Sequence, residues 1–168
     1  MATFRAATLT DREAICRVHT RAIREMAASA YAPPQIEAWA GFLTPESYTQ
    51  VIKAGRVFVA EYSGRIVGFG QFNAETGEVE ATYVLPDVRG RGVGRTLLSE
   101  AESRARAGGL TSIHVSASLN AVPFYEATGF MREKQAYHQL PSGVSLECVV
   151  MCKRLDGADA QPALAGDR

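Results

Sequence analysis

The sequence predicts a single α/β domain in which helices flank a mixed, mostly antiparallel sheet. Residues 56–86 are rich in β-formers and alternate apolar with polar side chains, as strands do. Two pairs of such segments are separated only by short turns, which indicates antiparallel hairpins. Over residues 78–118 a strand, a helix and a second strand follow one another, the pattern of a parallel pair joined by a right-handed crossover.

The N-terminal third is mainly helical after a short strand at residues 4–8. Thr10 to Glu13 fit a capping box, because a glutamate follows the cap by three residues. Apolar residues at helical spacing then predict a helix that reaches about Ala30. Two prolines at 33–34 end this helix and start another, since proline fits a first helical turn. A further helical stretch is expected over residues 44–54.

The rest of the chain alternates strands with helices. One helix carries an apolar stripe of Val93, Leu97, Leu98, Ala101 and Ala105. Its expected stop is Gly108-Gly109. Asn120 is expected to cap a short helix that ends at Gly129. The expected strands are 56–62 and 65–73 around Ser63-Gly64, then 78–86, 112–118, and a final hairpin of 130–140 with 144–155.

Composition excludes several classes of protein. Lys and Arg together number 18, as do Asp and Glu, so the net charge is zero, unlike that of a dedicated nucleic-acid binder. No apolar run has transmembrane length and the first residues contain no signal-peptide core, so we expect a cytoplasmic protein without membrane contact. Cys16, Cys148 and Cys152 lack CxxC spacing and are expected to be reduced core residues, with no metal site.

The run RGRGVGR, residues 89–95, is the most unusual feature of the sequence. It fits neither the dinucleotide fingerprint, which needs glycine where Arg95 stands, nor a P-loop, which needs glycine where Arg89 stands. A glycine turn between a strand and a helix gathers unpaired N–H groups at the positive end of the helix dipole. Such a turn suits a pyrophosphate. A plain turn with solvated arginines is one alternative, and a nucleic-acid patch is disfavoured because no aromatic residues interleave.

Two motifs together resemble the GNAT superfamily of acyl-CoA-dependent N-acetyltransferases. Residues 84–94, with Leu97-Leu98 behind them, are similar to its acyl-CoA motif R/Q-x-x-G-x-G/A. Residues 120–130 match its later segment N-x-x-x-x-Y-x-x-x-G-F, and a helix and a strand separate the two motifs as in the family. The resemblance, to an uncharacterised bacterial branch, implies a GNAT-type domain over residues 1–155. Residues 156–168 are expected to form a disordered tail.

The resemblance implies acetyl-CoA as cofactor. The turn would hold its pyrophosphate, and the strand at 78–85 would splay from the strand after the helix and pair with the pantetheine amides. Asn120 would lie near the cofactor, with Phe124 packed beside it. The residues assigned to the cofactor are Tyr83, Val84, Arg89, Gly90, Arg91, Gly92, Val93, Gly94, Arg95, Asn120 and Phe124.

The catalytic residues implied by the resemblance are Tyr125, Glu78 and Glu80. Tyr125 would donate to the departing thiolate. Because a tyrosine with a pKa near 10 is a weaker acid than a thiol with a pKa near 8.5, it would have to act by hydrogen bonding or have a lowered pKa. The alternative is that Tyr125 is only an aromatic residue of the core. One of the two glutamates would act as the base. Because alternate side chains of a strand point to the same face, we expect both glutamates to share a face with Thr82 and Val84. His114 and His138 are alternatives by residue type alone.

The acceptor is expected to bind near Tyr31 and Trp39, because the region between the first two helices commonly lines the acceptor side in this family. Core packing of Trp39 explains the pattern equally well. The predicted reaction is transfer of an acetyl group from acetyl-CoA to a primary amine of a small molecule or peptide, by direct attack without an acyl-enzyme. A non-catalytic acyl-CoA-binding regulatory module is the alternative. The oligomeric state stays open, with a homodimer among the alternatives.

Overall fold

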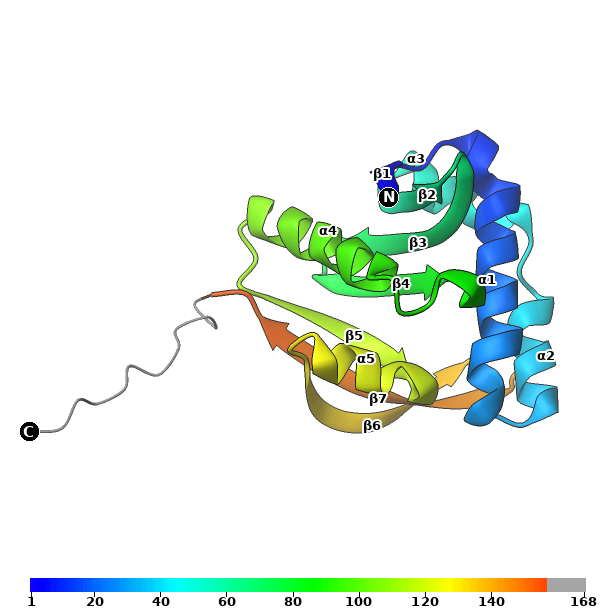
Figure 1. Cartoon of the computed structure of the whole chain (residues 1–168). Helices are drawn as coiled ribbons and strands as arrows, with labels where there is room; N and C mark the ends of the chain where they lie inside the picture. Colours follow the sequence, from blue (N-terminus) through cyan, green and yellow to red (C-terminus); the bar gives the residue numbers. More distant parts are fainter. Residues whose placement is uncertain (157–168) are drawn as a thin grey trace, which may run out of the picture.

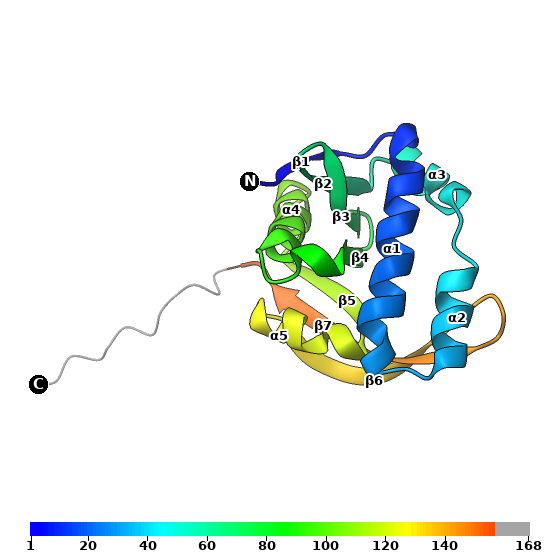
Figure 2. The ribbon, with the colours of Figure 1, turned by 45° about the vertical axis from the view of Figure 1, so that its right-hand side comes forward.

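A seven-stranded sheet forms the centre of the protein, with strand order β1-β2-β3-β4-β5-β7-β6. The computed structural model describes residues 1–156. Helices α1 and α4 both pack on β3 and β4, from opposite faces of the sheet (Figures 1 and 2). All neighbouring strands are antiparallel except β4 and β5. The predicted α/β domain with a mixed, mostly antiparallel sheet is therefore confirmed.

The helices and strands lie close to the predicted positions. The strands are β1 (Thr3–Ala6), β2 (Val57–Tyr62), β3 (Arg65–Asn73), β4 (Glu78–Val84), β5 (Ser112–Ser118), β6 (Met131–Gln139) and β7 (Ser145–Arg154). The helices are α1 (Arg12–Met26), α2 (Pro33–Gly41), α3 (Thr49–Lys53), α4 (Val93–Ala107) and α5 (Val122–Ala127).

The capping box predicted at Thr10 to Glu13 is wrong by two residues. Helix α1 begins at Arg12, after a short 3-10 turn whose own box joins Thr8 and Asp11. The Asp11 carboxylate accepts a hydrogen bond from the Thr8 N–H at 2.7 Å and a second from Arg5 at 2.8 Å. The Arg5 hydrogen bond also lowers the pKa of Asp11. The ion pair with Arg5 of β1 therefore helps to hold the Asp11 carboxylate in its capping position.

Helix α4 buries the predicted stripe against the sheet. Val93, Leu97, Leu98, Ala101 and Ala105 are all buried. Because α4 connects β4 to the parallel strand β5, the crossover predicted over residues 78–118 is confirmed.

Strands β4 and β5 separate after a single pair of residues. Glu78 and His114 form the only pairing between these strands, while β5 pairs with β7 along its whole length. On its other side β4 is paired with β3. The two strands therefore diverge toward their carboxyl ends and leave a gap in the middle of the sheet (Figure 1).

Two further observations concern helix length and the cysteines. Within residues 1–156, no helix has the length and apolar character needed to cross a membrane. The three cysteines are free thiols, of which Cys148 is buried and Cys16 and Cys152 are half-buried. The tail predicted at 156–168 lies, except for its first residue, outside the described residues.

Gly70 of β3 is expected to tolerate no side chain. A Cβ at this position would lie 2.3 Å from the Phe58 ring, which is buried beneath Arg104. Gly70→Ala should therefore reduce the free energy of unfolding by about 1–3 kcal/mol, as overpacking does. Urea denaturation followed by circular dichroism measures this change.

Gly41→Ala is the matched control for this substitution. A Cβ on Gly41 meets no atom within 4 Å at the end of α2. This change should leave stability unaltered or raise it by about 0.4–1 kcal/mol. Equal effects of the two substitutions would contradict the packing described for Gly70.

Candidate active site

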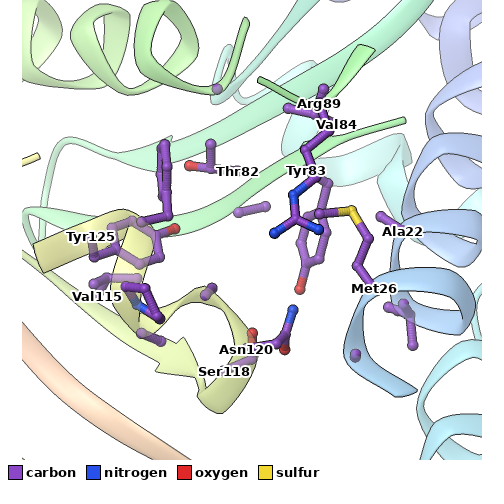
Figure 3. A pocket seen from close by; sticks show the side chains of 18 of the residues that line it. Ala22, Met26, Thr82, Tyr83, Val84, Arg89, Val115, Ser118, Asn120 and Tyr125 are labelled. Atoms are coloured by element: carbon purple, nitrogen blue, oxygen red, sulfur yellow. The ribbon is translucent and has the colours of Figure 1, made fainter. Parts of the chain in front are cut away.

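A cavity of about 590 Å³ occupies the gap between β4 and β5. Its walls come from both strands, from α1 and α2 on one side, and from the start of α4 and from α5 on the other. Figure 3 shows Tyr125 on one side of this cavity and Ala22 and Met26 of α1 on the opposite side. The cavity therefore runs through the sheet rather than lying on one face of it.

One end of the cavity is the N-terminus of α4. Gly90 and Gly92 have φ angles of 78° and 80°, the left-handed region that favours glycine. The first helical hydrogen bond of α4 runs from Thr96 N–H to the Gly92 carbonyl at 3.1 Å, so the N–H groups before Thr96 lack helical partners. A Cβ on Gly92 would meet no protein atom within 4 Å. The turn therefore has open space in front of these N–H groups, where an anion could bind.

The arginines of the turn do not all face the cavity. Arg89 and Arg95 line it, together with Gly90, Gly92, Val93 and Gly94. Arg91 is exposed and does not line it, so the structure gives no support to the prediction that this side chain binds the cofactor. Gly94 lies close to Phe124: a Cβ there would be 3.3 Å from the ring, so the ring would have to shift slightly to make room.

The middle of the cavity is bounded by strand backbone without a partner. Tyr83 and Val84 line it from β4, and residues 115–118 line it from β5. Because the β4–β5 ladder stops at Glu78, peptide groups on the facing edges have no strand to pair with. An extended chain that carries amides can add itself to such an edge.

Tyr125 lies at the wall formed by α5. Its side chain is 4% exposed and packs against Phe124 and Phe130 at ring-centroid distances of 5.1 and 5.2 Å. The ring reaches from α5 toward Thr82 of β4 (Figure 3). Burial raises the pKa of Tyr125 to about 12, although a hydrogen bond with Thr82 opposes this shift. The hydroxyl is therefore protonated and available as a donor at every physiological pH.

A register shift in β4 changes the predicted position of the two glutamates. Gln71 of β3 pairs with Ala81 and the next residue of β3 pairs with Val79, so Glu80 has no partner on β3. Its carboxylate accepts a hydrogen bond from Gln71 Nε2 at 2.6 Å and lies 3.7 Å from Arg56 Nη1. An extra residue of this kind redirects side chains and is common beside active sites.

The predicted common face of the glutamates with Thr82 and Val84 is therefore wrong. Paired residues share a face of the sheet, and Thr82 pairs with Gly70, whereas Glu80 contacts the adjacent Gln71. Glu80 thus lies on the face covered by α1, and Thr82 with Tyr125 lies on the other. Glu80 lines the cavity, whereas Glu78 sits at the closed end of the gap and does not line it.

Asn120 does not cap the helix as predicted. It lies inside a 3-10 turn, Leu119–Ala121, and makes no side-chain cap hydrogen bond. Its Oδ1 atom is buried without a hydrogen-bond partner. Figure 3 shows the Asn120 amide and the Tyr83 hydroxyl pointing toward each other at the floor of the cavity. Asn120 and Phe124 both line the cavity.

The two predicted acceptor residues have different positions. Trp39 lines the cavity, whereas Tyr31 lies behind it. The Tyr31 hydroxyl donates to the Glu147 carbonyl at 2.5 Å and accepts from the Leu119 N–H at 2.9 Å. The Trp39 ring packs edge-on against Tyr31, with centroids 5.7 Å apart. Tyr31 therefore supports the site without lining it.

Several lining residues were not predicted as part of the site. Ile23 and Met26 belong to the helical stripe of α1, which the sequence alone presents as core. Nothing in the sequence indicated that Thr82 belongs to the site, apart from its position on a predicted strand. The alternatives His114 and His138 do not line the cavity: His114 lies at the closed end of the gap, and His138 is exposed on β6.

Comparison with known proteins agrees with this geometry. Residues 27–140 match the family described as the acetyltransferase (GNAT) domain. The uncharacterised N-acetyltransferase YafP of Escherichia coli K12 is 30% identical over 128 residues, which cover 74% of this chain and 78% of YafP. A GCN5-related N-acetyltransferase from Rhodopseudomonas palustris superposes with a TM-score of 0.86 at 26% identity, covering 92% of this chain and 96% of that one.

A second solved structure carries the cofactor. The protein yncA of Salmonella typhimurium, determined with its cofactor acetyl-CoA, has a TM-score of 0.64 and 25% identity, with 96% of this chain and 98% of that chain covered. The present chain belongs to the GNAT acetyltransferase family. It is an acyl-CoA-dependent N-acetyltransferase, and its cofactor is acetyl-CoA. The open glycine turn and the unpaired strand edges fit this cofactor.

Substitution of Gly92 is expected to abolish binding of coenzyme A. A valine here would place its branched side chain in the open space in front of the N–H groups of α4, where the pyrophosphate is expected. Calorimetric titration of Gly92→Val with acetyl-CoA should show no saturable binding, whereas the natural protein binds.

Gly109→Val is the matched control, because Gly109 has a φ of 79°, close to that of Gly92, and equally open surroundings. Both variants carry the same backbone strain, so they should lose similar stability. Only Gly92→Val should lose the ligand. If both bind acetyl-CoA normally, the turn does not hold the pyrophosphate.

Proposed function

We propose that the protein transfers the acetyl group of acetyl-CoA to the primary amine of a small molecule or peptide, by direct attack of the amine on the thioester. The observation that supports this most is the continuity of one cavity from the α4 turn, past Tyr125, to Glu80 and Trp39. Bound acetyl-CoA supplies an activated acyl group. The side chains of the cavity supply a donor on one face of the sheet and a carboxylate on the other.

Tyr125 acts as a hydrogen-bond donor to the departing thiolate. With a pKa of about 12, complete transfer of its proton to a thiolate with an ordinary pKa of 8.5 would cost about 5 kcal/mol. A donated hydrogen bond to developing negative charge in a buried site needs no such transfer. The first of the two possibilities predicted from the sequence, hydrogen bonding, is therefore the one proposed.

Glu80 is the proposed base. An alkylamine is almost wholly protonated at pH 7, and removal of its proton costs about 4–5 kcal/mol before it can attack. Glu80 lines the cavity on the face covered by α1, and its carboxylate is held by Gln71 and Arg56. Because Glu78 does not line the cavity, Glu80 is preferred over it for taking up this proton, directly or through water.

An acyl-enzyme is not part of the proposal. None of the three cysteines lines the cavity, so no thiol is placed to attack the thioester. The free thiols also support the proposed cytoplasmic location. The catalytic domain is proposed to comprise residues 1–155, with Trp39 on the acceptor side.

Tyr125→Phe is expected to lower kcat by about 10²-fold, because the thiolate loses its donor. Affinity for acetyl-CoA should change little, since the ring remains in place. Steady-state release of free thiol gives kcat, and calorimetry gives the affinity. Since the pKa of Tyr125 is raised to about 12, its donor is lost only as the pH rises toward that value, so no fall in rate between pH 7 and 10 should come from this group.

Tyr48→Phe is the control for Tyr125→Phe. The Tyr48 hydroxyl is also buried, with His19 Nδ1 at 2.9 Å, but Tyr48 does not line the cavity. This variant should keep its kcat. An unchanged kcat in Tyr125→Phe would remove this residue from the mechanism.

Glu80→Gln and Glu78→Gln form a pair that separates the two candidate bases. Both changes remove one negative charge and preserve shape, but only Glu80 lines the cavity. We expect Glu80→Gln to lower kcat by about 10²-fold and Glu78→Gln to have a small effect. Equal or inverted effects on thiol release would show that the base is assigned to the wrong residue.

A further inference from the structure

We propose that the acceptor is a free amino acid, whose carboxylate binds the guanidinium of Arg89 while its amine faces the thioester. This inference rests on the proposed function and specifies its substrate class. It follows from the position of Arg89, which lines the cavity and has no anionic partner there.

The Arg89 side chain extends into the cavity. Figure 3 shows its guanidinium beside Tyr83 and Met26. The backbone N–H of Arg89 donates to the Pro86 carbonyl at 3.2 Å, so it is not among the N–H groups that are open to the pyrophosphate. That anion is expected in front of α4, at the N–H groups of residues 92–95. The guanidinium can therefore bind a different anion.

This part of the cavity lies on the face of the sheet that α1 covers. The Tyr83 ring packs against His19 of α1 with centroids 4.1 Å apart, and Met26 belongs to the same helix. Glu80, the proposed base, is on that face as well. The amine nitrogen would bond there to the acetyl carbon as the carbon–sulfur bond breaks, and Glu80 would take up the amine proton. The products would be an N-acetyl amino acid and coenzyme A.

Acidic residues near Arg89 are already paired with other arginines. Asp87 lies 3.4 Å from Arg21, and Glu80 lies 3.7 Å from Arg56. Within residues 1–156, Arg89 forms no ion pair with any carboxylate. The cavity thus contains one cation whose charge the protein does not balance, while the charge of Glu80 is balanced by Arg56.

A carboxylate matches this single cation. The reactive form of an amino acid, with its amine uncharged, carries one negative charge. An amine without an acid group would leave Arg89 unmatched, and a phosphate would bring nearly two negative charges. The planar guanidinium can also donate two parallel hydrogen bonds to a carboxylate. A free amino acid is therefore the acceptor that fits best.

Polar groups at the floor of the cavity extend the proposed carboxylate site. Figure 3 shows the Tyr83 hydroxyl pointing toward Asn120, with Ser118 close by. All three residues line the cavity. Burial raises the pKa of Tyr83, so its hydroxyl stays protonated and can donate. Arg89 and Tyr83 can thus donate to the same carboxylate.

A comparison of amino acids with their amides tests this inference. The common amino acids other than cysteine are screened for release of free thiol from acetyl-CoA, and each substrate is compared with its amide, which keeps the shape but loses the negative charge. We expect an amino acid with an apolar side chain to be used best, because Ile23, Met26 and Trp39 also line the cavity. Its kcat/KM should exceed that of the amide by about 10–100-fold, as expected for a hydrogen bond between charged groups.

Arg89→Gln tests the role of the guanidinium. The variant should raise KM for the amino acid by about 10–100-fold and abolish the preference for the amino acid over its amide, because the charged donor is lost. Its affinity for acetyl-CoA, measured by calorimetry, should change little, which also shows that the variant is folded.

Arg95→Gln is the matched control. Arg95 also lines the cavity, but its side chain donates to the Ala127 carbonyl at 3.4 Å, at the end of α5. This variant should keep the preference for the amino acid over its amide. If Arg89→Gln instead weakens binding of acetyl-CoA and keeps that preference, the guanidinium serves the pyrophosphate and the proposal is overturned.

Tyr83→Phe tests the second donor. The ring can keep its packing against His19, while the hydroxyl is removed. We expect KM for the amino acid to rise by about tenfold with little change in kcat. An unaltered KM would overturn the placement of the carboxylate beside Tyr83.

The outcomes separate the substrate class from the reaction. Thiol release with phenethylamine, spermidine or a peptide amide, but with no amino acid, would overturn the substrate class and leave the acetyl transfer intact. Preference for phosphoethanolamine over every amino acid would also overturn it, in favour of a phosphate. Saturable binding of acetyl-CoA without thiol release for any of these amines would count against both the substrate class and the proposed reaction.

Discussion

The gap between β4 and β5 creates the cavity and determines which side chains and peptide groups face it. A sheet normally pairs every inner strand on both sides, but here the ladder ends after Glu78 and His114. Unpaired peptide groups in a protein interior are costly unless a partner satisfies them. A cofactor whose arm carries amides supplies that partner. We therefore propose that the pantetheine arm of acetyl-CoA pairs with these strand edges and completes the sheet.

The two sides of this gap have different chemical characters. On the α4 and α5 side lie an open glycine turn and the buried Tyr125 hydroxyl, which we propose bind the phosphates and the departing thiolate. On the α1 and α2 side lie the Glu80 carboxylate, which is the proposed base, and the Trp39 ring. The register shift in β4 makes this division, because it turns Glu80 away from Thr82 and Tyr125. The proposed donor and the proposed base therefore lie on opposite faces of the sheet.

Local patterns made much of the fold predictable. Hairpins, the apolar stripe on α4 and the glycine turn all depend on residues close in sequence. The spacing of apolar residues and the residue types of the turns are therefore enough to predict them. The common face assigned to Glu80 and Thr82 was wrong because an extra residue in β4 depends on pairing with Gln71, which sequence spacing does not reveal. Met26 was expected to be a core residue because it follows the helical spacing of the other apolar residues of α1. That spacing is the same whether the helix faces a gap in the sheet or a closed sheet.

Amide hydrogen exchange with and without acetyl-CoA tests whether the cofactor fills the gap between β4 and β5. If the cofactor completes the sheet, peptides covering residues 81–84, 92–95 and 115–118 should exchange more slowly when it is bound. Exchange in β1 and β2, which are paired at a distance from the gap, should change far less. Saturable binding without added protection in β4 and β5 would contradict the account, since the cofactor would then lie outside the gap.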